Sequence, residues 1–298
     1  MEMIERYQGC LLGLAVGDAL GTTLEFKPRG TFEPIDDMVG GGCFDLEPGQ
    51  WTDDTSLALC LAESLIEKKG FDPYDQMKKY LLWYRTGYLS STGYAFDIGG
   101  TTKAALNSFE KTGEPFSGPT DPRSSGNGSL MRLAPVPMFF FPDREAMIFY
   151  AGESSRTTHG SQACIDACRL FASILFNAFS GMDKERVLFD HDVNIVQSPA
   201  IREMASGAYR NKTEDRIQGS GYVVKSLEAA LWCFYATDSF RDAVLKAANL
   251  GDDADTTAAI CGQVAGAYYG FQKIPGIWVN KVVKKEEIIE YSRNLYRG

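Results

Sequence analysis

The chain has 298 residues, 44% hydrophobic and 23% charged, a balance typical of a folded globular protein rather than a disordered one. Its net charge is −9 and it contains no long run of Lys and Arg, so non-specific binding of nucleic acid is not expected. Seven cysteines stand mostly among apolar residues, and the N-terminus predicts neither a signal peptide nor a membrane span. These features predict a cytoplasmic protein with reduced thiols and no membrane partner.

Apolar residues recur at intervals of three to four along most of the chain, which is the period of an α-helix. The first such segment, 4–21, is apolar nearly all round and therefore predicts a buried helix. Glycines recur along one face of it, at Gly9, Gly13, Gly17 and Gly21. This spacing favours close approach of another backbone. Further helices are predicted at 55–68, 74–86, 145–155, 162–180, 222–236, 240–249, 256–270 and 286–296, with a second glycine stripe at Gly262, Gly266 and Gly270.

The sequence contains no series of alternating strands. One apolar run, 136–141, could be a strand, but prolines flank and interrupt it. The longest irregular stretch, 112–128, is long for a connection inside a compact domain, which favours a functional loop. Because no shift in composition divides the chain, we predict a single all-α domain over residues 1–298.

Two segments, 51–56 and 251–257, place clustered Asp and Thr oxygens at predicted helix starts. Asp and Thr are also ordinary N-caps, so either segment alone could be structural. Capping uses one side-chain oxygen, however, whereas each segment supplies several, and adjacent carboxylates repel unless a cation lies between them. Oxygen donors without His or Cys favour Mg²⁺, Mn²⁺ or Ca²⁺. Two such helix starts could bridge two cations that orient a water molecule.

Two glycine-rich turns could serve an anionic substrate. Residues 124–132 form a turn that precedes a predicted helix start, where free backbone N–H groups could bind phosphate, although an ordinary loop capped by Ser129 is the alternative. In the second turn, 95–102, Asp97 could be a general base or an N-cap. His159 could hydrogen-bond a substrate or be structural, and His191 is expected at the surface. Two histidines are too few for a metal site built on three, and no Ser-His-Asp spacing is present.

Taken together, these motifs resemble those of the ADP-ribosylglycohydrolase family, most closely the bacterial dinitrogenase reductase-activating glycohydrolases. The resemblance spans nearly the whole chain, in order. The matching segments are 9–13, 17–21, 25–26, 51–55, 97–99, 126–132, 158–160, 221–224 and 251–256.

The resemblance implies an all-α orthogonal multi-helix bundle with two divalent cations, Mg²⁺ or Mn²⁺, at the base of an ADP-ribose cleft. The implied metal ligands are Thr52, Asp53, Asp54, Asp253, Asp255 and Thr256, whereas Asp252 falls outside the pattern. Asp97 matches a catalytic acid and Glu25 a mobile acid over the metals, and either could protonate the leaving group. The substrate-binding residues would be Gly99, Gly100, Thr101, Gly126, Asn127, Gly128, Ser129, His159 and Tyr222.

The implied reaction is hydrolysis of the glycosidic bond between ADP-ribose and a modified acceptor. Arginine in a protein is the favoured acceptor, and serine, a nucleobase or a small guanidine compound stays open. Two alternatives remain. A two-metal phosphoester hydrolase would release phosphate instead of ADP-ribose, and an inactive relative that only binds ADP-ribose would be expected to lack metal-site aspartates. All six ligand positions are present here, which favours an enzyme.

Overall fold

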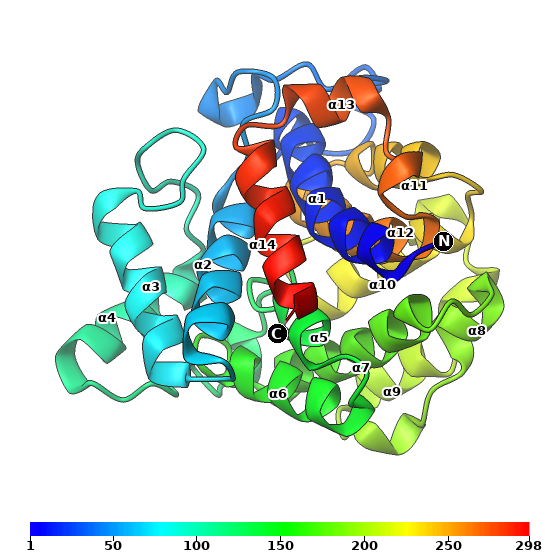
Figure 1. Cartoon of the computed structure of the whole chain (residues 1–298). Coiled ribbons are helices and arrows are strands. Elements are labelled where there is room, and N and C mark those ends of the chain that lie inside the picture. Colours follow the sequence, from blue (N-terminus) through cyan, green and yellow to red (C-terminus); the bar gives the residue numbers. More distant parts are fainter. Residues whose placement is uncertain (298) are drawn as a thin grey trace.

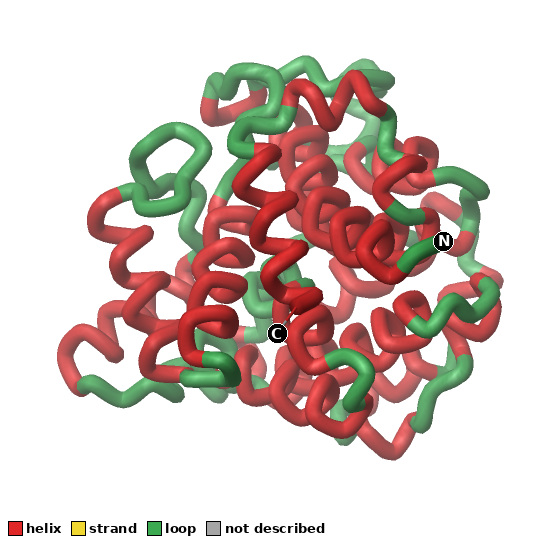
Figure 2. The backbone as a smooth tube through the Cα atoms, viewed as in Figure 1, coloured by secondary structure: helices red, strands yellow, loops and turns green. Residues whose placement is uncertain are grey.

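The structure is a computed structural model that describes residues 1–297 (Figure 1). Within these residues the regular structure consists of fourteen α-helices and seven short 3₁₀ turns. β pairing in the same range is limited to two isolated bridges, Gly41 with Leu46 and Gly126 with Tyr222 (Figure 2). The predicted all-α class is therefore confirmed.

The nine predicted helices are all present, each within two residues of its predicted bounds. They are α1 (Met3–Gly21), α2 (Asp53–Lys68), α3 (Pro73–Thr86), α6 (Arg144–Arg156), α7 (Gln162–Phe179), α10 (Val223–Tyr235), α11 (Phe240–Ala248), α12 (Ala254–Tyr269) and α14 (Lys285–Arg297).

Five further helices were not predicted: α4 (Gly100–Thr112), α5 (Pro135–Phe140), α8 (Lys184–Phe189), α9 (Pro199–Ala205) and α13 (Gly276–Lys281). Four of them have only six or seven residues, too few to display a helical period. The run that could have been a strand is the helix α5, because a proline in the first helical turn gives up no needed N–H. Helix α4 begins at Gly100 after the N-cap Gly99, and this pair of glycines weakens a helical pattern.

Helices α1 and α12 pack against each other in antiparallel orientation near the centre of the molecule (Figure 1). Their contact is made by backbone: a Cβ atom on Gly13 would overlap the carbonyl oxygen of Gly262, and one on Gly21 would overlap that of Ala254. The predicted close approach is thus confirmed. Gly270 is not part of this contact, because its φ of 83° ends α12 and it faces Met1 instead.

The remaining helices surround this pair. Helix α14 crosses α1 and packs on α2 and α5, α11 and α10 flank α12, and α6 and α7 form a lower layer (Figure 1). One cluster of buried hydrophobic side chains runs from Tyr7 to Leu295. None of the helices described in residues 1–297 has the length and apolar content needed to cross a bilayer.

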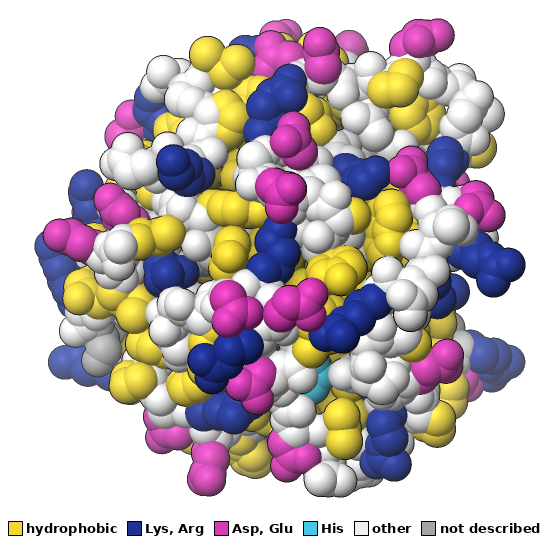
Figure 3. All heavy atoms as spheres, turned by 90° about the vertical axis from the view of Figure 1, so that its right-hand side faces the viewer, with side chains coloured by type: hydrophobic (Ala, Val, Ile, Leu, Met, Phe, Trp, Pro, Cys, Tyr) yellow, Lys and Arg dark blue, Asp and Glu magenta, His cyan; other side chains and the backbone are white. Residues whose placement is uncertain are grey.

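The distribution of charged side chains on the surface is relevant to nucleic-acid binding, which needs a basic region. On the face drawn in Figure 3, Lys and Arg side chains lie among Asp and Glu side chains and do not form a continuous basic stripe.

Candidate active site

A cleft of about 290 Å³ opens where α1 ends and where α2, α4 and α12 begin. Six carboxyl side chains line it: Glu25, Asp53, Asp54, Asp97, Asp253 and Asp255. Within residues 1–297 no lysine or arginine lines the same cleft. The cleft therefore concentrates negative charge without a basic side chain of its own.

The start of α2 is held by a buried acid from α1. Asp18 Oδ1 accepts hydrogen bonds from the backbone N–H and hydroxyl of Thr52, at 2.9 and 3.0 Å. Its Oδ2 accepts from the N–H and hydroxyl of Thr55, at 3.0 and 2.6 Å. These four bonds fix the helix start so that Asp53 and Asp54 line the cleft. The side chain of Thr52 binds Asp18 and lies behind the lining.

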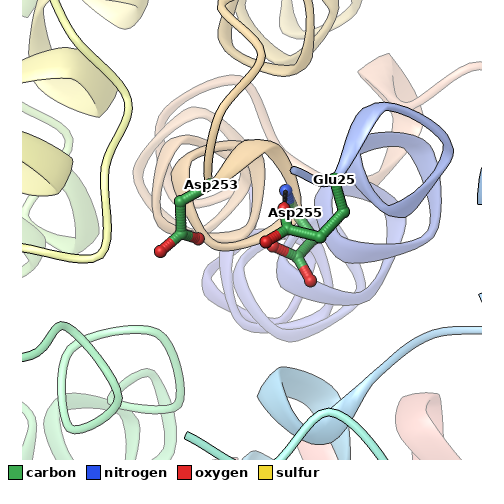
Figure 4. Close-up of side chains that lie close together, drawn as sticks. All are labelled: Glu25, Asp253 and Asp255. Carbon is green, nitrogen blue, oxygen red and sulfur yellow. Dashed lines mark hydrogen bonds between the residues drawn. The ribbon is translucent and has the colours of Figure 1, made fainter. Parts of the chain in front are cut away.

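The start of α12 carries the second group of acids (Figure 4). Glu25, just beyond α1, reaches across so that its Oε2 accepts from the backbone N–H of Ala254 at 2.8 Å. Carboxylate oxygens of Glu25, Asp253 and Asp255 all lie within 4.8 Å of one another, close enough to share a metal ion. The hydroxyl of Thr256 donates to Asp54 Oδ1 at 3.4 Å, which links the two helix starts.

Burial and mutual repulsion perturb these acids. Burial first, and then the charge of Asp255, hold the pKa values of Asp53 and Asp54 well above the usual range. The same two causes raise the pKa of Asp97 to about 11, and burial with the charge of Asp253 raises that of Asp255 to about 7. Within the described residues Asp54 Oδ2 is buried and has no hydrogen-bond partner. These carboxylates must take up protons or a cation, and their oxygen donors fit a divalent cation.

Another part of the cleft wall is the backbone of a glycine turn beside Asp253, whose Oδ2 accepts from the Asn127 side-chain amide at 3.0 Å. Gly126, Asn127 and Gly128 line it, and among residues 1–297 the N–H groups of Gly128 and Ser129 donate to no protein atom. The first residues of α4 line it too, with Gly99 as the N-cap and Gly100 and Thr101 following. Free N–H groups at a turn and at a helix N-terminus favour an anion.

All the predicted site residues except Thr52, Ser129 and Tyr222 line this cleft. Ser129 is buried and its hydroxyl accepts from Ser155 at 2.9 Å. Tyr222 is half exposed, precedes α10 and pairs with Gly126 through its backbone. The turn that contains Ser129 opens no helix directly, which corrects the prediction, because turns continue to Ala134 and α5 begins only at Pro135.

Sequence reasoning missed the role of Asp18, although the motif that contains it was part of the resemblance. A single acid inside an otherwise apolar, buried helix was the available signal, since a buried carboxylate needs partners. Asp252, which was left out of the ligand pattern, is exposed, and its backbone pairs with residues 26 and 27.

Fold and cleft together define an all-α protein with a carboxylate-rich site of the kind that hydrolases use to hold divalent cations. A family model described as ADP-ribosylglycohydrolase matches residues 1–298. The chain therefore belongs to the ADP-ribosylglycohydrolase family of hydrolases, and the resemblance noted from its motifs is confirmed.

Named relatives cover nearly the whole chain. An ADP-ribosylarginine hydrolase, Tri1 of Serratia proteamaculans, is 42% identical over 99% of this chain and 80% of its own length. The ADP-ribosyl-[dinitrogen reductase] glycohydrolase of Rhodospirillum rubrum is 30% identical over 95% of this chain and 92% of its own. A solved structure titled ADP-ribosylglycohydrolase-related protein complex superimposes with a TM-score of 0.88 at 42% identity, covering 99% of this chain and 98% of that one.

Proposed function

We propose that this protein hydrolyses the N-glycosidic bond between ADP-ribose and an arginine side chain of a modified protein. One observation carries the proposal: the same cleft combines a group of acids that calls for a cation with unpaired backbone N–H groups on a glycine turn. Such a cleft can bind a ribose beside metal ions while it holds a diphosphate through backbone. The similarity to proteins named ADP-ribosylarginine hydrolase favours arginine over serine or a nucleobase as the acceptor.

The residues proposed to hold two divalent cations, Mg²⁺ or Mn²⁺, are Thr52, Asp53, Asp54, Asp253, Asp255 and Thr256. The fit is supported by the unpartnered Asp54 Oδ2 and by the absence of a basic lining side chain within residues 1–297. Thr52 donates its hydroxyl proton to Asp18 and accepts from the N–H of Asp54 at 3.5 Å, which leaves one lone pair of that oxygen for a cation. When bound, the cations would polarise the ribose hydroxyls and stabilise developing negative charge.

Proton transfer to the departing nitrogen is assigned to Asp97 in preference to Glu25. One carboxylate oxygen of Glu25 already accepts from the N-terminus of α12, which ties this side chain to the site framework. Asp97 lies at the edge of the cleft in a left-handed conformation, φ 62°, ahead of the first turn of α4. Asp97 is partly exposed whereas Glu25 is buried, so it is the more accessible of the two to an incoming side chain.

The ADP-ribose moiety is proposed to lie against the N-terminus of α4 and the turn 126–129, with Tyr222 at the rim. His159 lies under this turn: a Cβ atom on Gly128 would come within 2.8 Å of its ring. The product would be free ADP-ribose and an unmodified arginine. A cytoplasmic location and a specific protein target remain predictions.

The test is to incubate the purified protein, with Mg²⁺ or Mn²⁺, with arginine-, serine- and nucleobase-linked ADP-ribose and to follow release by mass spectrometry. We expect intact ADP-ribose from the arginine conjugate, and none after chelation. Asp53→Ala should abolish release, whereas Asp252→Asn, which changes an exposed neighbour of the site, should retain it. Release of phosphate would identify a phosphoester hydrolase, and binding without release an inactive relative.

A further inference from the structure

The GNGSLMR segment ends in a buried arginine that the proposed reaction does not use. Arg132 has no exposed surface, and within residues 1–297 none of the oxygens that accept from its guanidinium belongs to a carboxylate. Its guanidinium donates instead to neutral oxygens: the Tyr80 hydroxyl and the Thr158 hydroxyl, both at 2.7 Å, and the carbonyl of Gly128. A buried charge without a counter-ion is costly, so the position calls for an explanation.

One of these partners, the Thr158 hydroxyl, connects Arg132 to a residue that lines the cleft, His159. Thr158 Oγ1 lies 2.9 Å from Nδ1 of His159. A guanidinium carries only N–H donors, so Arg132 must donate to this hydroxyl. The one hydroxyl proton then remains for Nδ1, because Thr158 Oγ1 has no other acceptor among the described residues. The arrangement favours Nδ1 as the acceptor and the ring proton on Nε2.

The other ring nitrogen, Nε2, faces the glycine turn. A Cβ atom on Gly126 or Gly128 would lie 3.2 Å from Nε2 of His159, and the ring lines the cleft. Within residues 1–297 no protein atom accepts a hydrogen bond from Nε2. Burial and then the charge of Arg132 lower the pKa of His159 to about 3, so the ring is neutral near neutral pH. Nε2 therefore lies beside the turn that carries the unpaired N–H groups of Gly128 and Ser129.

We propose that Arg132, acting through Thr158, is a positioning residue that fixes His159 as an Nε2–H donor to the anionic part of the ligand. The proposal rests on the proposed function, since it takes the diphosphate of ADP-ribose as that anion. The guanidinium also lies directly behind the Gly128 carbonyl, where its uncompensated charge favours an anion at the turn without touching it. In this proposal the two motifs 126–132 and 158–160 act together to bind the anionic part of the ligand.

The tautomer can be measured directly, because the chain has only two histidines. In a long-range ¹H–¹⁵N correlation spectrum of histidine-labelled protein, His191→Gln leaves a single imidazole and makes the assignment unambiguous. We expect Nε2 of His159 to be protonated and Nδ1 to be unprotonated, with no change between about pH 5 and about pH 8. A proton on Nδ1 in the wild-type ring would overturn the proposal without any change at Thr158.

The relay is tested by Thr158→Val, which keeps the shape of the side chain and removes the hydroxyl. We expect a mixture of tautomers and an ADP-ribose affinity, by calorimetry, weaker by about tenfold, which corresponds to about 1.4 kcal/mol. Thr158→Ser should restore both. The matched control is Thr157→Val, which removes an equally buried hydroxyl that binds Ser154 and not the imidazole.

The outcomes separate this proposal from the proposed function. If Thr158→Val keeps both the tautomer and the affinity of the wild type, or if Thr157→Val has the same effect, the relay is wrong. If the wild type binds no ADP-ribose but Thr158→Val alone shifts the tautomer, the relay stands and the proposed function fails.

Discussion

The buried acids predict an unusual pH dependence of stability in the metal-free protein. Burial raises the pKa of Asp255 from 3.8 to about 7 and that of Asp18 to about 6. Between 3.8 and these values the folded chain binds more protons than the unfolded chain, so the free energy of unfolding must fall as pH rises. Most globular proteins with paired carboxylates behave in the opposite way over this range.

The magnitude follows from the pKa values. A difference of one pH unit between folded and unfolded pKa corresponds to about 1.4 kcal/mol, so Asp255 alone accounts for a loss on the order of 4 kcal/mol between about pH 4 and pH 7. Mg²⁺ should reverse the loss where the carboxylates are ionised. At a concentration one hundred times its dissociation constant, a single bound ion adds about 2.7 kcal/mol.

The assay is urea denaturation followed by tryptophan fluorescence, at about pH 5 and about pH 8, with chelator and then with excess Mg²⁺. The chelated protein should be less stable at the higher pH, and Mg²⁺ should stabilise it more there. Asp255→Asn should reduce the pH dependence, whereas Asp252→Asn, at an exposed position, should leave it unchanged. A chelated wild type that gains stability from pH 5 to pH 8, or an equal effect of Mg²⁺ at both, would refute the reasoning.

Four substitutions extend these expectations. Gly17→Ala puts a Cβ into the backbone of α12 and should cost about 3 kcal/mol in urea unfolding, whereas Gly70→Ala meets open space and should be neutral. Asp97→Asn should lower kcat roughly 10²–10⁴-fold while calorimetry shows little change in ADP-ribose affinity. Gly128→Val should weaken that affinity, because the new side chain would collide with the imidazole under the turn. Asp18→Asn replaces one of two accepting oxygens with a donor, and should weaken Mg²⁺ binding in a calorimetric titration without altering any cleft-lining residue.

The long helices were predictable because each buries one face, and burial imposes a period that a single sequence displays. Helix α4 was not, although it has thirteen residues, because its start reads Gly-Gly-Thr-Thr from the N-cap Gly99 onward and the helix has no apolar residue before Ala104. Its N-terminus nevertheless lines the cleft. A helix end that carries free N–H groups at a site tends to begin with the small residues that obscure it in sequence.

The acids of the site were predictable one by one, since clustered Asp and Thr at helix starts exceed what capping needs. Their mutual placement was not. Asp18 binds Thr52, 34 residues away, and Glu25 caps a helix that starts 229 residues later. Such contacts depend on how the helices pack, and no local pattern encodes the partner.

The glycine pattern of α1 explains the mutual placement of these acids once α12 is known to be its packing partner. In antiparallel order, Gly9 meets Gly266, Gly13 meets Gly262 and Gly21 meets Ala254, so every fourth residue of α1 faces a small residue of α12. Glycine in a helix costs about 1 kcal/mol relative to alanine, a cost that close packing must offset. In this structure the close packing of α1 on α12 also determines where Glu25 lies. Because the pairing ends with Gly21 against the first residue of α12, the chain leaving α1 passes directly over the start of α12, and Glu25 can reach its free N–H groups. Larger residues along this contact would push the helices apart and move Glu25 away from Asp253 and Asp255. The glycines of α1 therefore help to position the carboxylates of the active site, although none of these glycines lines the cleft.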